Sequence, residues 1–127
     1  MELVFSTASA ELFEIGEDFV GECKKAFPKD HILECLDRPV VAFNGNDPVG
    51  IFEVSHNYLE DTLWIDSLWV HPNHRLNGVG SAMLKYLIET CQFAKIKLFA
   101  ANHSEPFYER NGFSKGIGRY YGKKIDD

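Results

Sequence analysis

The middle of the sequence contains two strand-like segments on either side of a helix-like segment, and this order restricts the fold more than any other feature. Thr62 to Val70 is rich in β-branched and aromatic side chains, which is typical of a strand, and Pro72 ends it. From Gly78 to Cys91 apolar side chains recur on one helical stripe, and Ile96 to Ala101 is a mostly apolar run of strand length. Together these segments predict a β-α-β unit with a right-handed crossover.

The same kind of patterning predicts further elements on both sides of this unit. Before it we expect a strand at 3–5, helices at 9–28 and 30–39, and a hairpin of strands at 40–43 and 49–55. After it we expect a short helix at 104–110 and one final strand at 113–125 that glycines interrupt. The predicted class is α+β, with a mixed, mostly antiparallel sheet flanked by helices. A chain of 127 residues fits a single domain over residues 1–127.

Charge and cysteine content exclude several classes of function. The 13 Lys and Arg against 19 Asp and Glu give a formal net charge of −6, which opposes binding to nucleic acid or to an anionic membrane. No apolar run approaches the roughly 20 residues that span a bilayer, and no signal peptide is evident. The three cysteines are odd in number and lack CxxC spacing, so we expect neither a disulfide framework nor a zinc site. A soluble, cytoplasmic protein is the simplest expectation.

The turn between the predicted strand and the predicted helix carries the clearest chemical signal. Arg75 is followed by Gly78 and Gly80 in the pattern Arg-x-x-Gly-x-Gly. Glycines at a helix N-terminus let backbone N–H groups approach an anion closely, and the helix dipole favours a phosphate there. The dinucleotide pattern GxGxxG is excluded because position 83 is Met83, and the P-loop pattern is absent. The alternative is that the two glycines only permit a tight turn.

Three motifs, in order, resemble those of the GNAT superfamily, the acyl-CoA-dependent N-acyltransferases. They are Ile65 to Pro72, the Arg75-x-x-Gly78-x-Gly80 loop, and Pro106 to Phe113. The resemblance covers nearly the whole chain and implies a β-α-β acyl-CoA-binding core. It implies an N-acetyltransferase that moves an acetyl group from acetyl-CoA directly to a primary amine. The alternatives are a non-catalytic acyl-CoA-binding or sensing module on the same fold, and a plain partner-binding domain.

The resemblance also implies which residues hold acetyl-CoA. The pantetheine arm is expected to pair with the backbone of Leu68, Trp69 and Val70. The pyrophosphate is expected on the backbone N–H groups of the loop, which consists of Arg75, Leu76, Asn77, Gly78, Val79 and Gly80. The side chain of Val79 is expected mainly in the core. Asn102 is similar to an asparagine that lies near the pantetheine in the family.

Three side chains are candidates for the chemistry. Tyr108 matches the family's tyrosine general acid, and a phenol of pKa about 10 is close enough to a thiol of about 8.5 for useful proton transfer. By strand alternation Asp66 shares a sheet face with Trp64 and Leu68, and it is expected to orient the amine or remove its proton. Glu53 is the second candidate for that role. The alternatives are an aromatic core role for Tyr108 and plain solvated carboxylates for Asp66 and Glu53.

The sequence departs from the family pattern at two places. Leu76 and Asn77 stand where the family usually has small or basic residues, which removes positive charge from the phosphate loop. Only 14 residues follow Phe113, so we expect a shortened C-terminal end. Either the last hairpin is minimal, or a partner subunit in a homodimer completes the sheet edge.

The expected partners follow from these residues. The acceptor is expected to be a small-molecule or protein amine, and the net acidity together with Asp66 favours a cationic or polyamine-like molecule. His71 and His74 are three residues apart, but no third ligand is evident, so no metal is expected.

Overall fold

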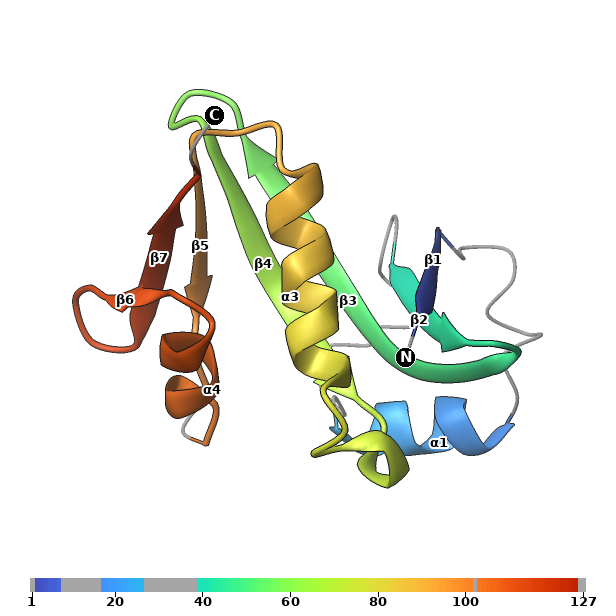
Figure 1. The fold of residues 1–127 in the computed structure, drawn as a ribbon. Coiled ribbons are helices and arrows are strands. Elements are labelled where there is room, and N and C mark those ends of the chain that lie inside the picture. The colour runs from blue at the N-terminus through green and yellow to red at the C-terminus, as the bar shows by residue number, and fades with distance from the viewer. Residues whose placement is uncertain (1, 8–16, 27–38, 102, 126–127) are drawn as a thin grey trace. The chain divides into compact units, whose positions relative to one another are not determined.

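The computed structural model describes residues 2–7, 17–26, 39–101 and 103–125 of the chain (Figure 1). Of the predicted helix at 9–28, the described part is α1, Glu17–Ala26. The predicted helix at 30–39 lies outside the described residues except for its closing Pro39, and Asn102 lies outside them as well.

Seven strands form one mixed sheet in the order β1-β2-β3-β4-β5-β7-β6. The strands are β1 Leu3–Thr7, β2 Val40–Asn44, β3 Asp47–Asn57, β4 Thr62–Val70, β5 Lys95–Phe99, β6 Ser114–Lys115 and β7 Tyr120–Lys124; beside α1, the helices are η2 Pro72–His74, α3 Val79–Thr90 and α4 Glu105–Arg110. β4 and β5 run parallel, whereas β1–β2, β2–β3, β5–β7 and β6–β7 are antiparallel. The predicted mixed sheet and the β-α-β unit of β4, α3 and β5 are therefore confirmed. No helix in the described ranges is long and apolar enough to cross a membrane.

Contacts within the chain divide it into two compact units. The first unit comprises residues 1–53 and 67–83, and the second comprises residues 54–66 and 84–127. β3, β4 and α3 each belong partly to one unit and partly to the other. Each unit has its own set of buried side chains.

The core of the first unit consists of apolar side chains from β2, β3, α1 and the start of α3. The buried residues include Phe19, Cys23, Val41, Ala42, Val49, Ile51, Phe52, Val79 and Met83. Four consecutive residues of β3, from Val49 to Phe52, are buried, so this part of the strand is covered on both faces. Burial also raises the pKa of the Cys23 thiol to about 11, which keeps this thiol protonated and unreactive at neutral pH.

Gly50 lies at the most crowded point of β3. A Cβ atom added there would lie 2.7 Å from Met83 Sδ and 3.0 Å from the carbonyl oxygen of Trp69. Both distances are shorter than ordinary van der Waals contacts. The missing side chain therefore allows the start of α3 to pack closely on this strand.

We expect Gly50→Ala to lower the free energy of unfolding by about 1–3 kcal/mol, because the new methyl group overpacks a filled core. Gly21→Ala is the matched control, since a Cβ at this position of α1 would meet nothing within 4 Å. In a helix that exchange stabilises by about 0.5–1 kcal/mol. Urea unfolding of the two variants measures both changes. A Gly50→Ala variant as stable as the parent chain would contradict the crowding.

The sheet of the second unit has a buried face and a more open one. Along β5, Ile96 and Leu98 are buried, whereas Phe99 is 58% exposed. β5 pairs with β7 along its whole length, and there Tyr121 is buried while Tyr120 is 49% exposed. The strand predicted at 96–101 is confirmed as β5, but burial alternates along it, so it has an open polar and aromatic face and is not largely buried.

The end of the chain corrects one prediction. The segment 113–125 was expected as one interrupted strand, but it forms the two antiparallel strands β6 and β7. Gly118 takes a left-handed φ of +62° in the connecting turn, and the Gly116 N–H donates to the Tyr120 carbonyl at 2.7 Å. The glycines therefore reverse the chain instead of interrupting a strand. A short hairpin is therefore present at this end, and completion of the sheet edge by a partner subunit stays a prediction.

Candidate active site

The loop between β4 and α3 lies in the first unit, and Arg75 ties it to the end of the strand. Arg75 Nε donates to the Val70 carbonyl oxygen at 3.0 Å. This bond uses one of the five N–H donors of the guanidinium, so the planar group is held at the loop with further donors on its other nitrogens. The side chain of Arg75 is exposed, as a group that meets a soluble anion must be.

Two residues of this loop adopt left-handed backbone. Leu76 has a φ of +67° and Gly78 a φ of +82°, and they turn the chain so that α3 begins at Val79. The first intrahelical bond runs from Ala82 N to Gly78 O at 3.0 Å, so the N–H groups of Val79 and Gly80 have no intrahelical acceptor. The first turn of α3 contains no acidic residue. Backbone N–H groups without an intrahelical acceptor, at a helix start without acidic side chains, are a favourable environment for an anion.

Leu76 is the strained member of this loop, because a left-handed conformation costs a residue with a Cβ atom about 1–2 kcal/mol. Its side chain is fully exposed and loses little packing when removed. We expect Leu76→Gly to raise the free energy of unfolding by about 0.5–1 kcal/mol, since glycine removes the strain but is more flexible in the unfolded chain. Leu76→Ala keeps the strain and is the control. Chemical denaturation measures the free energy of unfolding of both variants. Equal values for Leu76→Gly and Leu76→Ala would contradict the strain at this residue.

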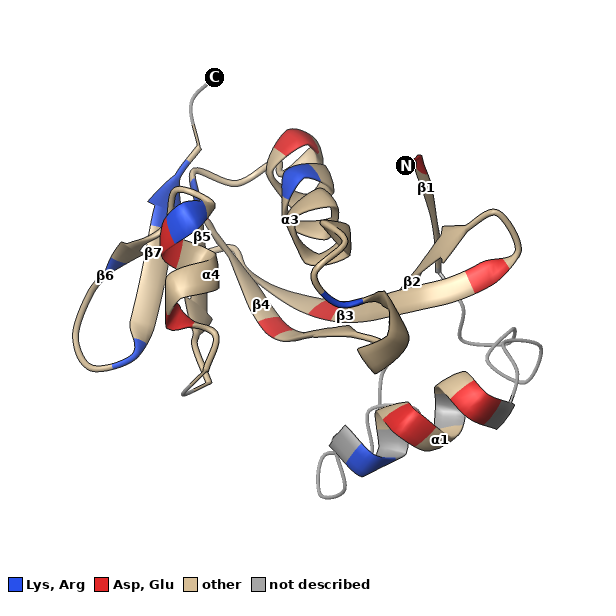
Figure 2. Cartoon of the chain, turned by 60° about the horizontal axis from the view of Figure 1, so that its bottom comes forward, with Lys and Arg blue, Asp and Glu red and all other residues tan. Residues whose placement is uncertain are grey.

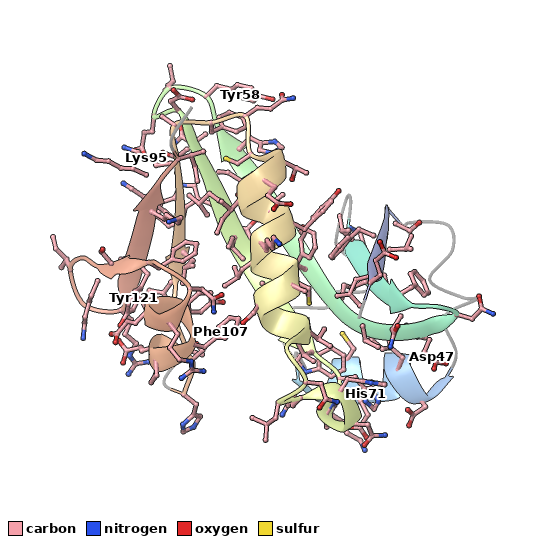
Figure 3. The ribbon with its side chains drawn as sticks, in the orientation of Figure 1. Asp47, Tyr58, His71, Lys95, Phe107 and Tyr121 are labelled. Atoms are coloured by element: carbon pink, nitrogen blue, oxygen red, sulfur yellow. The ribbon has the colours of Figure 1, made fainter. Side chains whose placement is uncertain are left out.

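His71 holds the beginning of the same loop to α1. Its ring is buried, Nδ1 accepts a hydrogen bond from Asn73 N at 3.1 Å, and Nε2 lies 3.0 Å from Asp18 Oδ2 (Figure 3). Because Nδ1 accepts, the proton lies on Nε2 and is donated to Asp18. The His71 ring also stacks on Phe19, with ring centroids 6.1 Å apart. Both ring nitrogens are thus used structurally, and within the described ranges no three metal-ligating side chains come together.

β4 presents the residues expected to hold the pantetheine arm. Its ladder with β5 ends at the Ile65–Leu98 pair, and the strand continues to Val70. Trp69 is buried against Phe19, with ring centroids 5.3 Å apart, whereas Leu68 and Val70 are half-buried. The side chain of Trp69 therefore serves the core, and only its backbone is placed to meet a ligand.

The two carboxylates proposed for the amine lie in different units. Asp66 belongs to the second unit, is exposed, and accepts a hydrogen bond from Ser55 Oγ at 3.1 Å. Glu53 belongs to the first unit and is half-buried on β3. Asp66 is thus solvated and oriented by a neighbouring strand, which leaves its lone pairs accessible to an amine.

Tyr108 lies on α4 in the second unit and is buried. Its ring packs against Phe113 and Phe107, with ring centroids 5.8 Å and 5.0 Å away. Burial raises the pKa of the Tyr108 phenol to about 12, so the group stays neutral through the physiological range. The expected aromatic surroundings of Tyr108 and a neutral, proton-bearing hydroxyl are both present.

A tyrosine that the sequence analysis did not single out holds α4 in place. The hydroxyl of Tyr121 on β7 lies 2.8 Å from Glu109 Oε1 and 3.1 Å from Glu105 Oε1 (Figure 3). Lys115 Nζ lies 3.4 Å from the same Glu105 oxygen. Burial and these two carboxylates raise the pKa of Tyr121. Glu105 and Glu109 are four residues apart and so lie on one face of the helix. This spacing was the feature of the sequence that could have indicated a hydrogen-bond donor facing them.

The raised pKa of Tyr108 predicts a specific loss of stability in alkali. The folded chain keeps this proton to about pH 12, whereas an unfolded tyrosine loses it near pH 10. Between these values the unfolded state binds fewer protons, so the free energy of unfolding falls as pH rises, by up to about 1.4 kcal/mol per pH unit. We expect the free energy of unfolding of Tyr108→Phe to fall less steeply with pH, as measured by urea unfolding between pH 10 and about 12. Parallel curves for the two proteins would contradict the prediction.

Comparison with known proteins agrees with this geometry. The family model described as "Acetyltransferase (GNAT) family" matches residues 8–113. No curated protein matches the chain. Among solved structures, an aminoglycoside 6′-N-acetyltransferase complexed with coenzyme A superposes with a TM-score of 0.77 at 15% identity, over 98% of both chains.

Two longer proteins share the fold over part of their length. N-acetylglutamate synthase from Neisseria gonorrhoeae, complexed with coenzyme A and N-acetyl-glutamate, superposes with a TM-score of 0.78 at 13% identity, over 100% of this chain and 36% of that one. Nourseothricin acetyltransferase has a TM-score of 0.60 at 21% identity, over 70% of this chain and 65% of that one. This chain therefore spans about two thirds of the second protein and about a third of the first. Because the family model covers most of the sequence, the chain belongs to the GNAT family of acetyl-CoA-dependent N-acetyltransferases.

Proposed function

We propose that the chain transfers an acetyl group from acetyl-CoA directly to a primary amine. The observation that carries this proposal is the conformation of the loop before α3. Its left-handed residues Leu76 and Gly78 turn the chain into α3, whose first N–H groups have no intrahelical acceptor and are suited to a pyrophosphate. In this proposal the backbone of residues 75–80 holds the pyrophosphate, and Arg75 adds a charged fork to it.

The pantetheine arm then lies along β4. The strand continues for five residues after its last pair with β5, which leaves a backbone edge at Leu68 to Val70. Amide groups of the pantetheine can pair with such an edge as an added strand does. This use of the backbone agrees with a Trp69 side chain that is committed to the core.

The chemistry needs a neutral amine and a stabilised leaving group. The amine nitrogen attacks the thioester carbonyl carbon, a C–N bond forms, and the C–S bond breaks to leave a thiolate. The surplus proton of the amine passes to Asp66 or, through water, to solvent, and the thiolate takes up one proton. Complete transfer from a phenol of pKa about 12 to a thiolate of pKa about 8.5 is uphill by about 5 kcal/mol. Tyr108 therefore acts as a hydrogen-bond donor to the developing thiolate, and solvent supplies the final proton.

Tyr108→Phe tests this role, because it removes the hydroxyl and keeps the ring that fills the site. We expect kcat to fall by about 100-fold, the usual loss for one transition-state donor, with the KM for acetyl-CoA unchanged. Tyr58→Phe is the control, since Tyr58 is 78% exposed in the turn between β3 and β4. Thiol release from acetyl-CoA gives both constants. Unchanged turnover in Tyr108→Phe would remove the assignment.

The same assay separates transfer from binding alone. Free thiol released from acetyl-CoA in the presence of a panel of amines supports the proposed enzyme. A rise in Tm with acetyl-CoA but no thiol release would identify an acyl-CoA-binding module instead. No response of Tm to acetyl-CoA would overturn the cofactor site itself.

The acceptor is not determined by the fold. The neighbours that share it include an aminoglycoside acetyltransferase and a synthase bound to N-acetyl-glutamate, so basic and acidic molecules both occur with this architecture. The acceptor class must therefore come from the side chains of this chain.

A further inference from the structure

The net negative charge of the chain is unevenly distributed. Residues 95–124 contain seven of the 13 Lys and Arg but only two of the 19 Asp and Glu. Figure 2 shows Lys and Arg on β6, β7 and the loop that joins them. A substrate that reaches this part of the second unit meets a basic surface, whatever the charge of the whole molecule.

The second unit contains a cavity of about 360 Å³ on the open face of its sheet. Its walls include Trp64 of β4, Lys97 of β5, Tyr120 of β7 and Ile117 of the β6–β7 turn. The Trp64 and Tyr120 rings meet edge to face, with centroids 6.2 Å apart. Volume and lining suit a small aromatic or apolar group.

Gly122 helps to form this cavity. It lies opposite Lys97 in the β5–β7 ladder and brings no side chain to the open face. A Cβ at this position would come no closer than 3.7 Å to any neighbour, which is an ordinary van der Waals distance. Close packing of the backbone therefore does not explain the glycine. The glycine thus leaves room beside Lys97 for a ligand.

Lys97 is the charged group of this cavity. Its Nζ lies 5.9 Å from the centroid of the Trp64 ring, a cation–π arrangement that holds the ammonium over the aromatic wall. Lys25, Lys85 and Lys115 each pair with a glutamate, whereas Lys97 forms no ion pair with any described residue. An anionic ligand group would supply a strong, charge-assisted partner.

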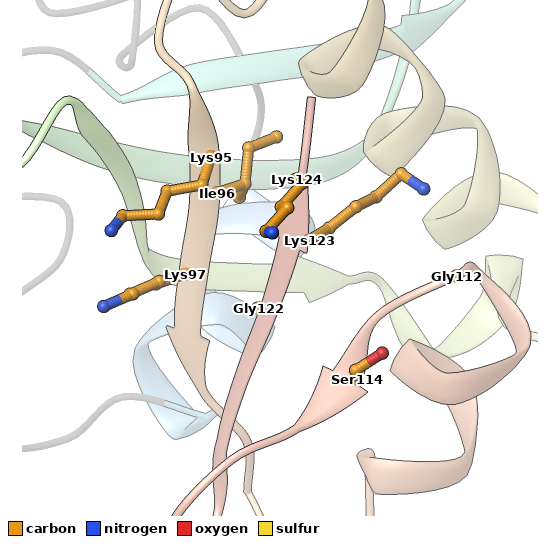
Figure 4. A pocket seen from close by; sticks show the side chains of 8 residues that line it. All are labelled: Lys95, Ile96, Lys97, Gly112, Ser114, Gly122, Lys123 and Lys124. Carbon is orange, nitrogen blue, oxygen red and sulfur yellow. The ribbon is translucent and has the colours of Figure 1, made fainter. Parts of the chain in front are cut away.

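The neighbouring lysines share a second, adjacent cavity with Lys97. A second cavity, of about 470 Å³, is lined by Lys95, Lys97, Lys123 and Lys124. Figure 4 shows Lys95 and Lys97 extending from the same side of β5, while Lys123 extends away from them. Lys123 therefore does not converge with Lys97. Lys95 lies on the same strand and face but does not line the cavity of about 360 Å³, so it supplies a control.

We propose that the cavity beside Lys97 binds an anionic group of the acceptor, so that the acceptor is an amine that carries a carboxylate on an aromatic or apolar body. The inference rests on the proposed acetyl transfer and names its substrate class. Asp66 follows Trp64 by two residues on the same face of β4, which places their Cα atoms about 7 Å apart. The amine then meets Asp66 at one end, and the carboxylate meets Lys97 at the other. This class replaces the polyamine-like acceptor expected from the net charge.

Two matched amines test the class. In 4-(aminomethyl)benzoate the amine and the carboxylate lie at opposite ends of one ring, and 4-methylbenzylamine lacks the carboxylate. We expect Lys97→Met to raise the KM for the first amine by about tenfold or more, and to leave the KM for the second unchanged. Lys97→Arg should restore most of the loss. Lys95→Met removes the same charge outside the cavity and should change neither KM.

Equal effects of Lys97→Met on both amines, or an equal effect of Lys95→Met, would overturn the proposal. Binding of 4-methylbenzoate, which has no amine to acetylate, is measured separately by titration calorimetry. Saturable binding of 4-methylbenzoate that Lys97→Met abolishes and Lys95→Met preserves supports the anion site. If no amine then releases thiol, the proposed acetyl transfer is refuted and the anion site still stands. Absence of this binding in the parent chain, or its persistence in Lys97→Met, would refute the anion site while thiol release still tests the transfer.

Discussion

The structure depends most on the point at which the parallel pairing of β4 with β5 stops, well before the end of β4. β4 has nine residues, yet its pairing with β5 ends at Ile65, after four of them. The paired part belongs to the second unit and carries Trp64. After Asp66, residues 67–70 belong to the first unit and lead into the loop at Arg75. Because one strand supplies both parts, the contacts proposed for the pantetheine arm and those proposed for the acceptor lie on the same strand, in different units.

The position of Tyr108 depends on how α4 is held, because this residue lies on the helix. The helix has six residues, too few to be stable by itself, and its contacts must fix it. Tyr121 offers one O–H to two carboxylates, Glu105 and Glu109, so only one of them receives the proton at any moment. Lys115 compensates by its charge beside Glu105. The face of α4 that carries Glu105 and Glu109 thus contacts the buried hydroxyl of Tyr121. Tyr108 of the same helix packs against aromatic rings.

The sequence predicted the elements that have a continuous apolar or β-branched pattern along the chain. It did not predict contacts between residues that are far apart in the sequence. The stripe of α3 and the β-branched run of β4 were sufficient to predict both elements and the position of the turn between them. The Asp18–His71 pair spans 53 positions, and no local pattern reports it. The turn at Gly118 was read as an interruption because a positive φ is not visible in composition. Alternation placed Asp66 on the face of Trp64, but it did not reveal that Lys97 on the next strand makes this face basic.

The two tryptophans of the chain are five positions apart on β4, so their side chains leave the strand on opposite faces, one in each unit. Trp69 is buried, with no hydrogen-bond partner for its indole N–H among the described residues, and an indole in such surroundings emits at short wavelength. Trp64 is half-buried beside the ammonium group of Lys97, so its indole lies in more polar surroundings. The two indoles therefore lie in different surroundings, and their emission can report on the two units separately, without any added label.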